Sequence, residues 1–173
     1  LYRLPIVGKQ PADDRKAADF LALCKRYAQG YPLQYLIGEW EFFGLPFKVG
    51  EGVLIPRPDT EILVDTALQL LKDRQAPVVA DLCSGSGCVA VAIAHERPDA
   101  AVYALELSPQ AFPYLTENIA RNNVSVQALR CDVLIPPPLP ALDLVVSNPP
   151  YIPRCEMQTL QNQVTFEPEM ALS

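Results

Sequence analysis

The first feature of the sequence that could do chemistry is a glycine-rich stretch, Asp81-Leu82-Cys83-Ser84-Gly85-Ser86-Gly87, between an apolar run and an alanine-rich segment. Glycines permit a tight strand-to-helix turn and a close approach of backbone to ligand, and a helix N-terminus offers unpaired N–H groups. The stretch matches neither the dinucleotide pattern G-x-G-x-x-G nor the phosphate-binding loop, which needs G-K-[ST]. The acidic Asp81 suits a ligand with an ammonium group better than a pyrophosphate. A simple β–α turn is the alternative interpretation.

Two further acids follow at the ends of later strands. Glu106 comes 25 residues after Asp81, where a carboxylate can accept hydrogen bonds from both hydroxyls of a ribose. Asp132 follows the next predicted strand, where it can accept from an adenine amino group with Val133 beside the ring. Each acid is a weak signal alone, since such residues are common at strand ends. Together with the glycine-rich stretch they predict a nucleoside site.

The sharpest motif is Asn148-Pro149-Pro150-Tyr151, which we call the NPPY segment. The side-chain oxygen of Asn148 and the backbone carbonyl of Pro149 are two acceptors that proline rigidity holds close together. A planar –NH2 group that donates to both would be fixed with its nitrogen exposed to an electrophile, and Tyr151 supplies a flat face beside it. An isolated proline-rich turn would be the plainer interpretation.

Alternating strands and helices must position these motifs. The pattern predicts helices over residues 59–73, 87–96 and 108–122, the last with Ser108 as N-cap and Pro109 at its first position. It predicts strands over residues 78–83, 101–105, 124–130 and 142–147. This order implies an α/β fold with a parallel sheet and helices on both faces, and the motifs then gather at the carboxyl ends of the strands.

A shorter region precedes this sheet. Apolar residues at helical spacing predict an amphipathic helix over residues 14–29, and aromatic and β-branched residues predict a β-hairpin over residues 34–49. We therefore divide the chain into a short helical lead (1–33), a hairpin linker (34–56) and a ligand-binding domain (57–173).

Composition excludes several classes of protein. The 173 residues have a formal net charge of −6 and no basic patch, which disfavours binding to the phosphates of nucleic acid. Five cysteines without a CxxC pair and one histidine indicate neither disulfides nor a metal site. No apolar run reaches the ~18 residues of a membrane span. We expect a monomer in the cytoplasm that contacts neither membrane nor nucleic acid.

With these motifs the chain resembles class I S-adenosylmethionine-dependent methyltransferases, and among them the release-factor glutamine methyltransferases, the HemK/PrmC family. The resemblance rests on Pro56-Arg57-Pro58-Asp59-Thr60-Glu61, on the NPPY segment and on Phe166-Glu167-Pro168. It implies a Rossmann-like sheet whose three C-terminal strands are missing here, so that the sequence resembles a piece of the family's chain cut at both ends. Residues 1–33 would then be the remnant of an N-terminal helical domain for substrate recognition, and residues 57–173 an incomplete S-adenosylmethionine-binding methyltransferase domain.

The resemblance also implies roles for the motif residues. S-adenosyl-L-methionine would be the cofactor, with Asp81, Cys83, Ser84, Gly85, Ser86 and Gly87 around its methionine part. Glu106 would bind the ribose, Asp132 and Val133 the adenine, and Asn148 would border the cofactor. Asn148 and Pro149 would be catalytic and, with Pro150 and Tyr151, would hold the substrate.

That substrate would be the glutamine of the GGQ loop in peptide chain release factors, methylated on N5. The alternatives are a glutamine methyltransferase of a ribosomal protein, an adenine-N6 methyltransferase of DNA or RNA, and an inactive nucleotide-binding module. Two residues depart from the family's pattern, which usually has glycine at the position of Cys83 and often aspartate at that of Glu106.

Overall fold

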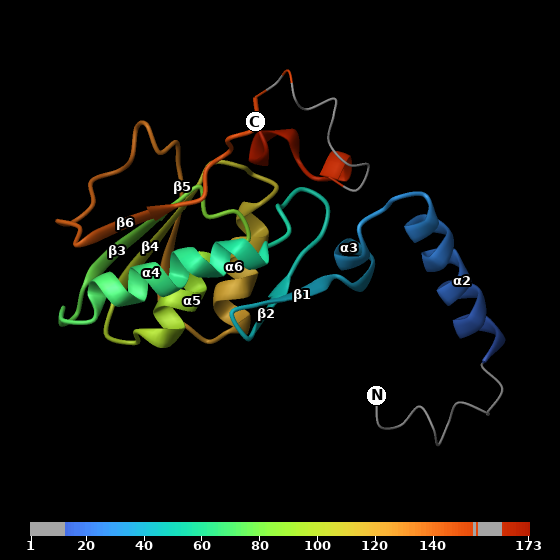
Figure 1. Cartoon of the computed structure of the whole chain (residues 1–173), viewed down its shortest axis with the longest axis horizontal. Coiled ribbons are helices and arrows are strands. Elements are labelled where there is room, and N and C mark those ends of the chain that lie inside the picture. The colour runs from blue at the N-terminus through green and yellow to red at the C-terminus, as the bar shows by residue number, and fades with distance from the viewer. Residues whose placement is uncertain (1–12, 154, 156–163) are drawn as a thin grey trace.

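The computed structural model describes residues 13–153, 155 and 164–173 of the chain. Its centre is a parallel sheet of four strands in the order β5-β4-β3-β6, shown in Figure 1. The strands are β3 (Val78–Leu82), β4 (Ala101–Glu106), β5 (Val126–Arg130) and β6 (Leu144–Ser147). The α/β class and the Rossmann-like sheet are confirmed, although β5 and β6 each begin two residues later than the sequence pattern predicted.

The strand order reverses direction once. From β3 the chain steps to β4 and β5 on one side, and then returns to place β6 on the other side of β3. The return runs through residues 131–143, which contain the proline-rich stretch and no helix. The strand order therefore changes direction between β3 and β6, and the carboxyl ends of these two strands are the topological switch point, where open α/β sheets bind ligands.

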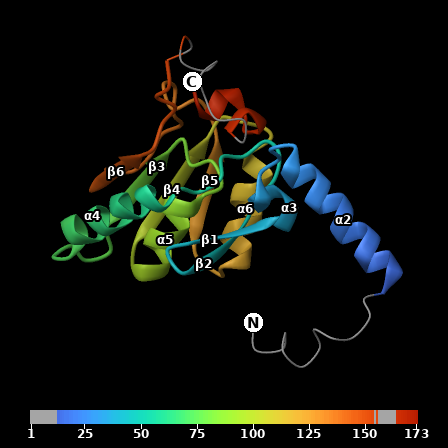
Figure 2. The ribbon, with the colours of Figure 1, turned by 45° about the vertical axis from the view of Figure 1, so that its right-hand side comes forward.

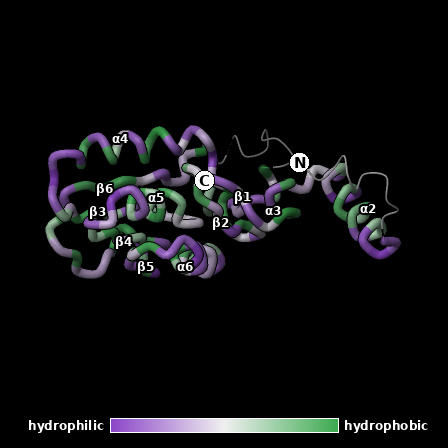
Figure 3. Tube along the Cα trace, turned by 90° about the horizontal axis from the view of Figure 1, so that it is seen from below, coloured by the Kyte–Doolittle hydropathy of each residue, from purple (hydrophilic) through white to green (hydrophobic). Residues whose placement is uncertain are grey.

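Three helices cover the sheet: α4 (Glu61–Leu71), α5 (Cys88–Glu96) and α6 (Phe112–Arg121). Figures 1 and 3 show all three on the same face, so the prediction of helices on both faces is wrong for the described residues. The reason is topological, because successive right-handed crossovers that step in one direction place their helices on one side. The crossover to β6 would lie on the other side, and it carries no helix.

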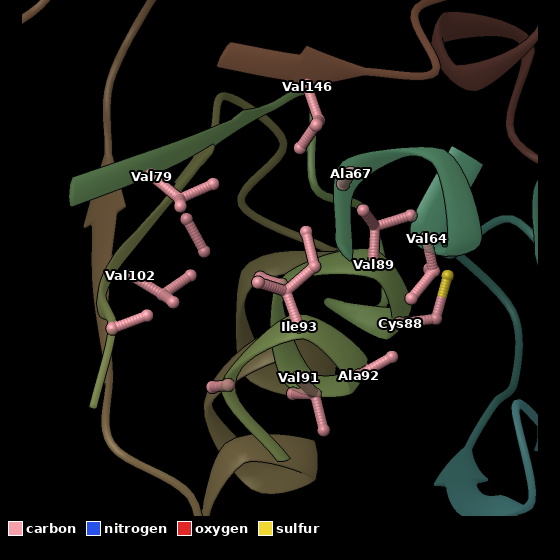
Figure 4. Packing of buried hydrophobic residues seen from close by; sticks show 14 of the residues in the cluster. Val64, Ala67, Val79, Cys88, Val89, Val91, Ala92, Ile93, Val102 and Val146 are labelled. Carbon is pink, nitrogen blue, oxygen red and sulfur yellow. The ribbon is translucent and has the colours of Figure 1, made fainter. Parts of the chain in front are cut away.

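The core lies between this face of the sheet and α5. Every residue of α5 from Cys88 to Ala94 is buried, which its alanine- and valine-rich sequence allows. Val79, Val102 and Val146 point from three neighbouring strands toward Ile93 and Val89 on the helix, as Figure 4 shows. This packing fixes the carboxyl ends of the strands relative to the start of α5.

The α6 helix begins at Phe112, four residues after the predicted N-cap. The Ser108 hydroxyl accepts hydrogen bonds from the backbone of Gln110 (3.2 Å) and Ala111 (3.1 Å), so it caps a turn that precedes the helix. The prediction of a helix from Ser108 was therefore wrong in its start, because a side chain that caps a turn has the same local signature as a helix N-cap.

The region before the sheet contains α2 (Asp14–Ala28), α3 (Leu33–Ile37) and the antiparallel pair β1 (Glu39–Phe42) and β2 (Leu45–Lys48). The predicted first helix is confirmed; Figure 2 shows it extending away from the sheet, and none of its residues is buried. The hairpin is shorter than predicted, because α3 occupies its first residues and ends at Gly38 with a φ of +78°. The buried Tyr35 on α3 donates a hydrogen bond from its hydroxyl to the Val53 carbonyl at 2.6 Å.

Short 3₁₀ turns complete the described chain: η1 (Pro58–Thr60) leads into α4, and η3 (Val164–Phe166) and η4 (Glu169–Ala171) lie near the C-terminus. Within the described residues, no helix is both long and apolar enough to cross a membrane.

Candidate functional site at the carboxyl edge of the sheet

The glycine turn, residues 83–87, and the NPPY segment start side by side. In the parallel pairing of β3 with β6, Leu82 is the register partner of Ser147. The Ser147 hydroxyl donates to the Leu82 carbonyl at 2.8 Å and ties the two strand ends together. The two motifs that the sequence singled out therefore flank the switch point.

The backbone of the glycine turn requires unusual conformations. Gly85 has a φ of +55° and Gly87 a φ of +82°, and a Cβ at Gly87 would lie 2.5 Å from the Cδ1 atom of Leu115. Cys83 has a φ of +59°, a left-handed conformation that costs an L-residue other than glycine roughly 1–2 kcal/mol. The cysteine that stands where the family usually has glycine therefore strains the backbone of the turn locally.

Glu106 fastens the glycine turn to the loop after β4. Its Oε2 accepts from the Gly85 backbone and its Oε1 from the Ser108 backbone, both at 2.7 Å, and the residue is buried. Each carboxylate oxygen has a second lone pair for another donor. Glu106 therefore has a structural contact in addition to any contact with a ligand.

Asp81 is the most deeply buried acid of the site, at 2% exposure. Its Oδ2 accepts from the Ala90 backbone at 3.2 Å. Burial raises the pKa of this carboxyl to about 7; hydrogen bonds from Ser84 and Ala90 oppose the rise, and the nearby charge of Glu106 adds to it. A cation beside Asp81 would favour its ionised form.

A cavity of about 200 Å³, which we call the first cavity, opens among these groups. It brings together most of the residues that the sequence predicted for a nucleoside, and these are Asp81, Cys83, Ser84, Gly85, Ser86, Glu106, Asp132, Val133 and Asn148. Pro150, which was predicted for the substrate, also lines it. Gly87 does not line it. Asp132 uses its Oδ1 to accept from the Leu134 backbone at 2.9 Å, which leaves its Oδ2 for another donor.

A second cavity of about 490 Å³ lies beside the first. Pro149 and Tyr151 line this one and not the first, and Tyr151 is 78% exposed. Asn148 lines both cavities, as do Arg57 and Thr60. The predicted nucleoside residues other than Gly87 thus line the first cavity, whereas Pro149 and Tyr151 of the predicted substrate residues line the second. Pro150 lines the first cavity, and Asn148 lines both.

The orientation of the Asn148 amide is set by Thr60, a residue whose role the sequence did not reveal. The Asn148 Nδ2 donates to the Thr60 hydroxyl oxygen at 3.3 Å. Because Nδ2 is bound to Thr60, just before the start of α4, the Oδ1 atom of Asn148 remains as an acceptor for a group in either cavity. Thr60 belongs to the Pro56–Glu61 motif, so the family resemblance was the one signal that pointed to it.

Two other contributors were also missed. Glu167 in the C-terminal segment, residues 164–173, forms an ion pair with Arg57 and accepts from the Ile55 backbone at 3.0 Å. Asn118 on α6 is fully buried and donates to the Ser86 carbonyl of the glycine turn at 2.9 Å. Both connect segments that are far apart in sequence, and no local pattern discloses such partners. Glu167 stands in the Phe166–Pro168 motif, so the family resemblance was the signal that could have found it.

The cysteines near the site are neutral thiols. Burial raises the pKa of Cys88 to about 12 and also raises that of Cys83, where the charges of Glu106 and Asp81 add to the effect. Within the described ranges, His, Cys, Asp and Glu side chains nowhere gather into a group that could hold a metal ion.

The sheet, its switch point and the two cavities define a Rossmann-like α/β protein with a ligand site at the carboxyl edge. Residues 59–166 match the family model described as "Methyltransferase small domain", and the chain belongs to this family.

Two curated relatives are named release factor glutamine methyltransferase. The protein of Fusobacterium nucleatum is 40% identical, over 93% of this chain and 46% of its own length. The protein of Burkholderia pseudomallei is 43% identical, over 95% of this chain and 60% of its own length. The chain thus spans about half the length of the curated relatives that it matches. A solved 16S rRNA N2 G1207 methyltransferase of T. thermophilus shares the fold, with a TM-score of 0.54, 23% identity and coverage of 66% of this chain and 32% of that one.

Proposed function

We propose that the whole protein is a methyltransferase that uses S-adenosyl-L-methionine to methylate the side-chain amide nitrogen of the glutamine in the GGQ loop of peptide chain release factors. The observation that carries the proposal is the place of Asn148, which lines both cavities and has its amide nitrogen held by Thr60. The names of the curated relatives support the same substrate. We further expect a cytoplasmic monomer that contacts neither nucleic acid nor membrane directly.

The lining of the first cavity suits a cationic nucleoside. Three carboxylates, Asp81, Glu106 and Asp132, line it together with apolar side chains such as Val53 and Val133. We assign the methionine part of the cofactor to the glycine turn, with its ammonium group toward Asp81. Glu106 would take the ribose hydroxyls, and Asp132 with Val133 the adenine. When bound, S-adenosylmethionine supplies an electrophilic methyl group on a sulfonium.

The second cavity would receive the substrate glutamine. Its –NH2 group would donate to the Asn148 Oδ1 and to the Pro149 carbonyl, which places the nitrogen at the junction with the first cavity. The exposed ring of Tyr151 offers a flat face to the planar amide. Because the Thr60 hydroxyl holds Nδ2 of Asn148, the amide has one preferred orientation, in which Oδ1 would be the acceptor for the substrate –NH2 group.

These contacts address the main chemical difficulty, which is the weak nucleophilicity of an amide nitrogen. Positioning of reactants can contribute ~7–11 kcal/mol to a rate enhancement. Hydrogen bonds from –NH2 to the two acceptors strengthen as positive charge develops on nitrogen, and they therefore stabilise the transition state more than the ground state. The proton can leave the nitrogen after the methyl group has arrived, so no strong base is required before transfer.

The two acceptors fit any planar –NH2 group, so the alternatives differ in substrate and not in geometry. An adenine in DNA or RNA would need a basic surface, and the net charge of −6 opposes it. A ribosomal-protein glutamine would be held in the same way, and the relatives' names favour the release factor over it. An inactive nucleotide-binding module would retain the first cavity and have no use for the acceptors.

The test is methyl transfer from labelled cofactor by the full-length protein to a release factor, a ribosomal protein and an oligonucleotide in parallel. We expect label on the release factor and none on a release factor whose loop glutamine is replaced by glutamate. Asn148→Ala should keep cofactor binding and lower the rate of methyl transfer by ~10²–10³-fold, which is the usual effect of removing one hydrogen bond that stabilises the transition state of an enzyme. Label on the oligonucleotide and none on the release factor would overturn the proposal.

A further inference from the structure

Arg57 is fixed from behind by a buried carboxylate. The Glu167 side chain is 2% exposed, and its Oε1 accepts from Nη2 of Arg57 while its Oε2 accepts from the Ile55 backbone. Both oxygens therefore bind one short stretch of the loop that lines the cavities. A carboxylate so enclosed and so fully engaged is an anchor, in contrast to an exposed pair that samples many geometries.

The guanidinium retains donors on its other side. Arginine has five N–H donors in a planar fork, and among the described residues the hydrogen bond to Glu167 is the one recorded for this side chain. Arg57 is 39% exposed and lines both cavities. Its position is thus fixed while donors remain for a ligand.

The charge of the first cavity indicates which ligand group those donors would bind. Asp81, Glu106 and Asp132 line it, and of its lining residues within the described chain Arg57 is the sole cation. The carboxylates suit ammonium, sulfonium and hydroxyl groups, but they repel an anionic group. A zwitterionic ligand would therefore place its carboxylate toward Arg57, where a charge-assisted, forked contact is available.

We propose that Arg57, positioned by Glu167, binds the carboxylate of the methionine part of S-adenosylmethionine. This assignment rests on the proposed function and deepens it, because it makes Arg57 the residue that distinguishes a nucleoside with a complete amino acid from one without a carboxylate. Glu167 is a positioning residue, which acts on the ligand through Arg57.

The test is calorimetric binding of S-adenosylmethionine and of decarboxylated S-adenosylmethionine to the full-length protein. The second ligand keeps the sulfonium and the amine and lacks only the carboxylate. We expect the protein to prefer the first ligand by about tenfold to a hundredfold, as befits a hydrogen bond between charged groups. Arg57→Gln should abolish this preference while binding of the decarboxylated ligand stays within about twofold. Arg57→Lys should keep part of the preference, since it keeps the charge and loses the fork.

Two further variants separate positioning from general damage. Glu167→Gln keeps an acceptor for the Ile55 backbone and removes the charge, so it should reduce the preference without abolishing binding of either ligand. Arg74→Gln removes a surface cation paired with Asp143 at 3.1 Å, away from both cavities, and should leave the preference unchanged. Melting temperatures without ligand show whether each variant folds.

Three outcomes would overturn the assignment. Equal weakening of both ligands by Arg57→Gln in a folded variant would make the residue structural. Unchanged binding of both, with a raised KM for the release factor, would assign it to the protein substrate. Failure of the unaltered protein to bind either ligand would instead reject the proposed cofactor, and this subsite with it.

Discussion

Asn118 and Ser86 join helix α6 to the glycine turn through one buried hydrogen bond, with Nδ2 of the asparagine 2.9 Å from the serine carbonyl. The same amide also holds β2, since it accepts from the Lys48 backbone at 2.7 Å and donates to the Lys48 carbonyl at 3.1 Å. One side chain thus links the turn to the hairpin from which the 49–57 loop departs, and that loop lines the first cavity at residues 52–54, 56 and 57.

Asn118→Ala should therefore lower both stability and cofactor affinity. It leaves the Lys48 backbone N–H without its partner, and we expect a loss of about 2–3 kcal/mol in the free energy of unfolding, measured in urea. Asn122→Ala is the matched control, because Asn122 donates to the Pro46 carbonyl at 3.1 Å and does not reach the turn. It should cost less than about 1 kcal/mol and leave cofactor binding unchanged. Equal effects of the two variants would contradict this role of Asn118.

Thr60→Val should slow methyl transfer without weakening cofactor binding. The variant keeps the shape of the side chain and removes the acceptor for Nδ2 of Asn148, which frees the amide to rotate. A misplaced reacting group can cost up to ~10²-fold in rate, so we expect a decrease of about tenfold to a hundredfold in kcat. Thr60→Ser should restore most of the rate. Thr66→Val, which removes a hydroxyl bonded to Ile62 on the exposed side of α4, should have no effect; a similar loss there would indicate damage to the helix instead.

The pKa of Asp81 predicts opposite pH trends for stability and for cofactor binding. In the folded protein burial raises its pKa to about 7 from the ordinary aspartate value of 3.8, so between these two pH values the folded state holds the extra proton. The free energy of unfolding should therefore fall as pH rises from about 4 to about 7 and then level off. A cationic ligand favours the carboxylate, so its affinity should rise from about pH 6 to about pH 8.

Asp81→Asn checks both trends, since it retains an acceptor and cannot titrate. Urea unfolding and calorimetry across the pH range should show that the variant loses the Asp81 contribution to each slope. Slopes identical to those of the unaltered protein would assign the titration to another group.

Cys83→Gly should stabilise the glycine turn relative to Cys83→Ala. Both substitutions remove the thiol, but only glycine adopts a φ of +59° without the clash of a Cβ atom. We expect the glycine variant to be more stable by about 1 kcal/mol in urea unfolding, after its larger chain entropy in the unfolded state is included. An alanine variant of equal stability would show that the turn is not strained at this residue.

Local signals were sufficient for much of the fold and of the site. Glycines, prolines and apolar periodicity marked the strand ends, and Asp81, Glu106 and Asn148 were therefore placed correctly at one edge of the sheet. The same rules failed for residues 34–37, which were predicted as part of the hairpin and belong to α3. Their aromatic and branched residues favour strands, whereas the contact of Tyr35 with Val53 and the turn at Gly38 select a helix.

The residues that were missed depend on distant partners. The partner of Thr60 lies 88 residues away in the sequence. The two partners of Asn118 lie 32 and 70 residues away, and Ile55, the backbone partner of Glu167, lies 112 residues away. A buried amide or carboxylate has the same local sequence context whether or not it finds such a partner. The partners of these three residues could therefore be identified only in the folded structure, although Thr60 and Glu167 stand in motifs that carry the family resemblance.

The bond between Ile55 and Glu167 has a consequence for the order in which the protein matures during synthesis. A chain leaves the ribosome N-terminus first, and its domains generally fold as units. The loop at Ile55 and Arg57 emerges early, but the carboxylate that fixes it is made 112 residues later. A nascent chain can thus form its first strands and helices well before it can hold Arg57 in place, and the finished ligand site appears only near the end of translation of this region.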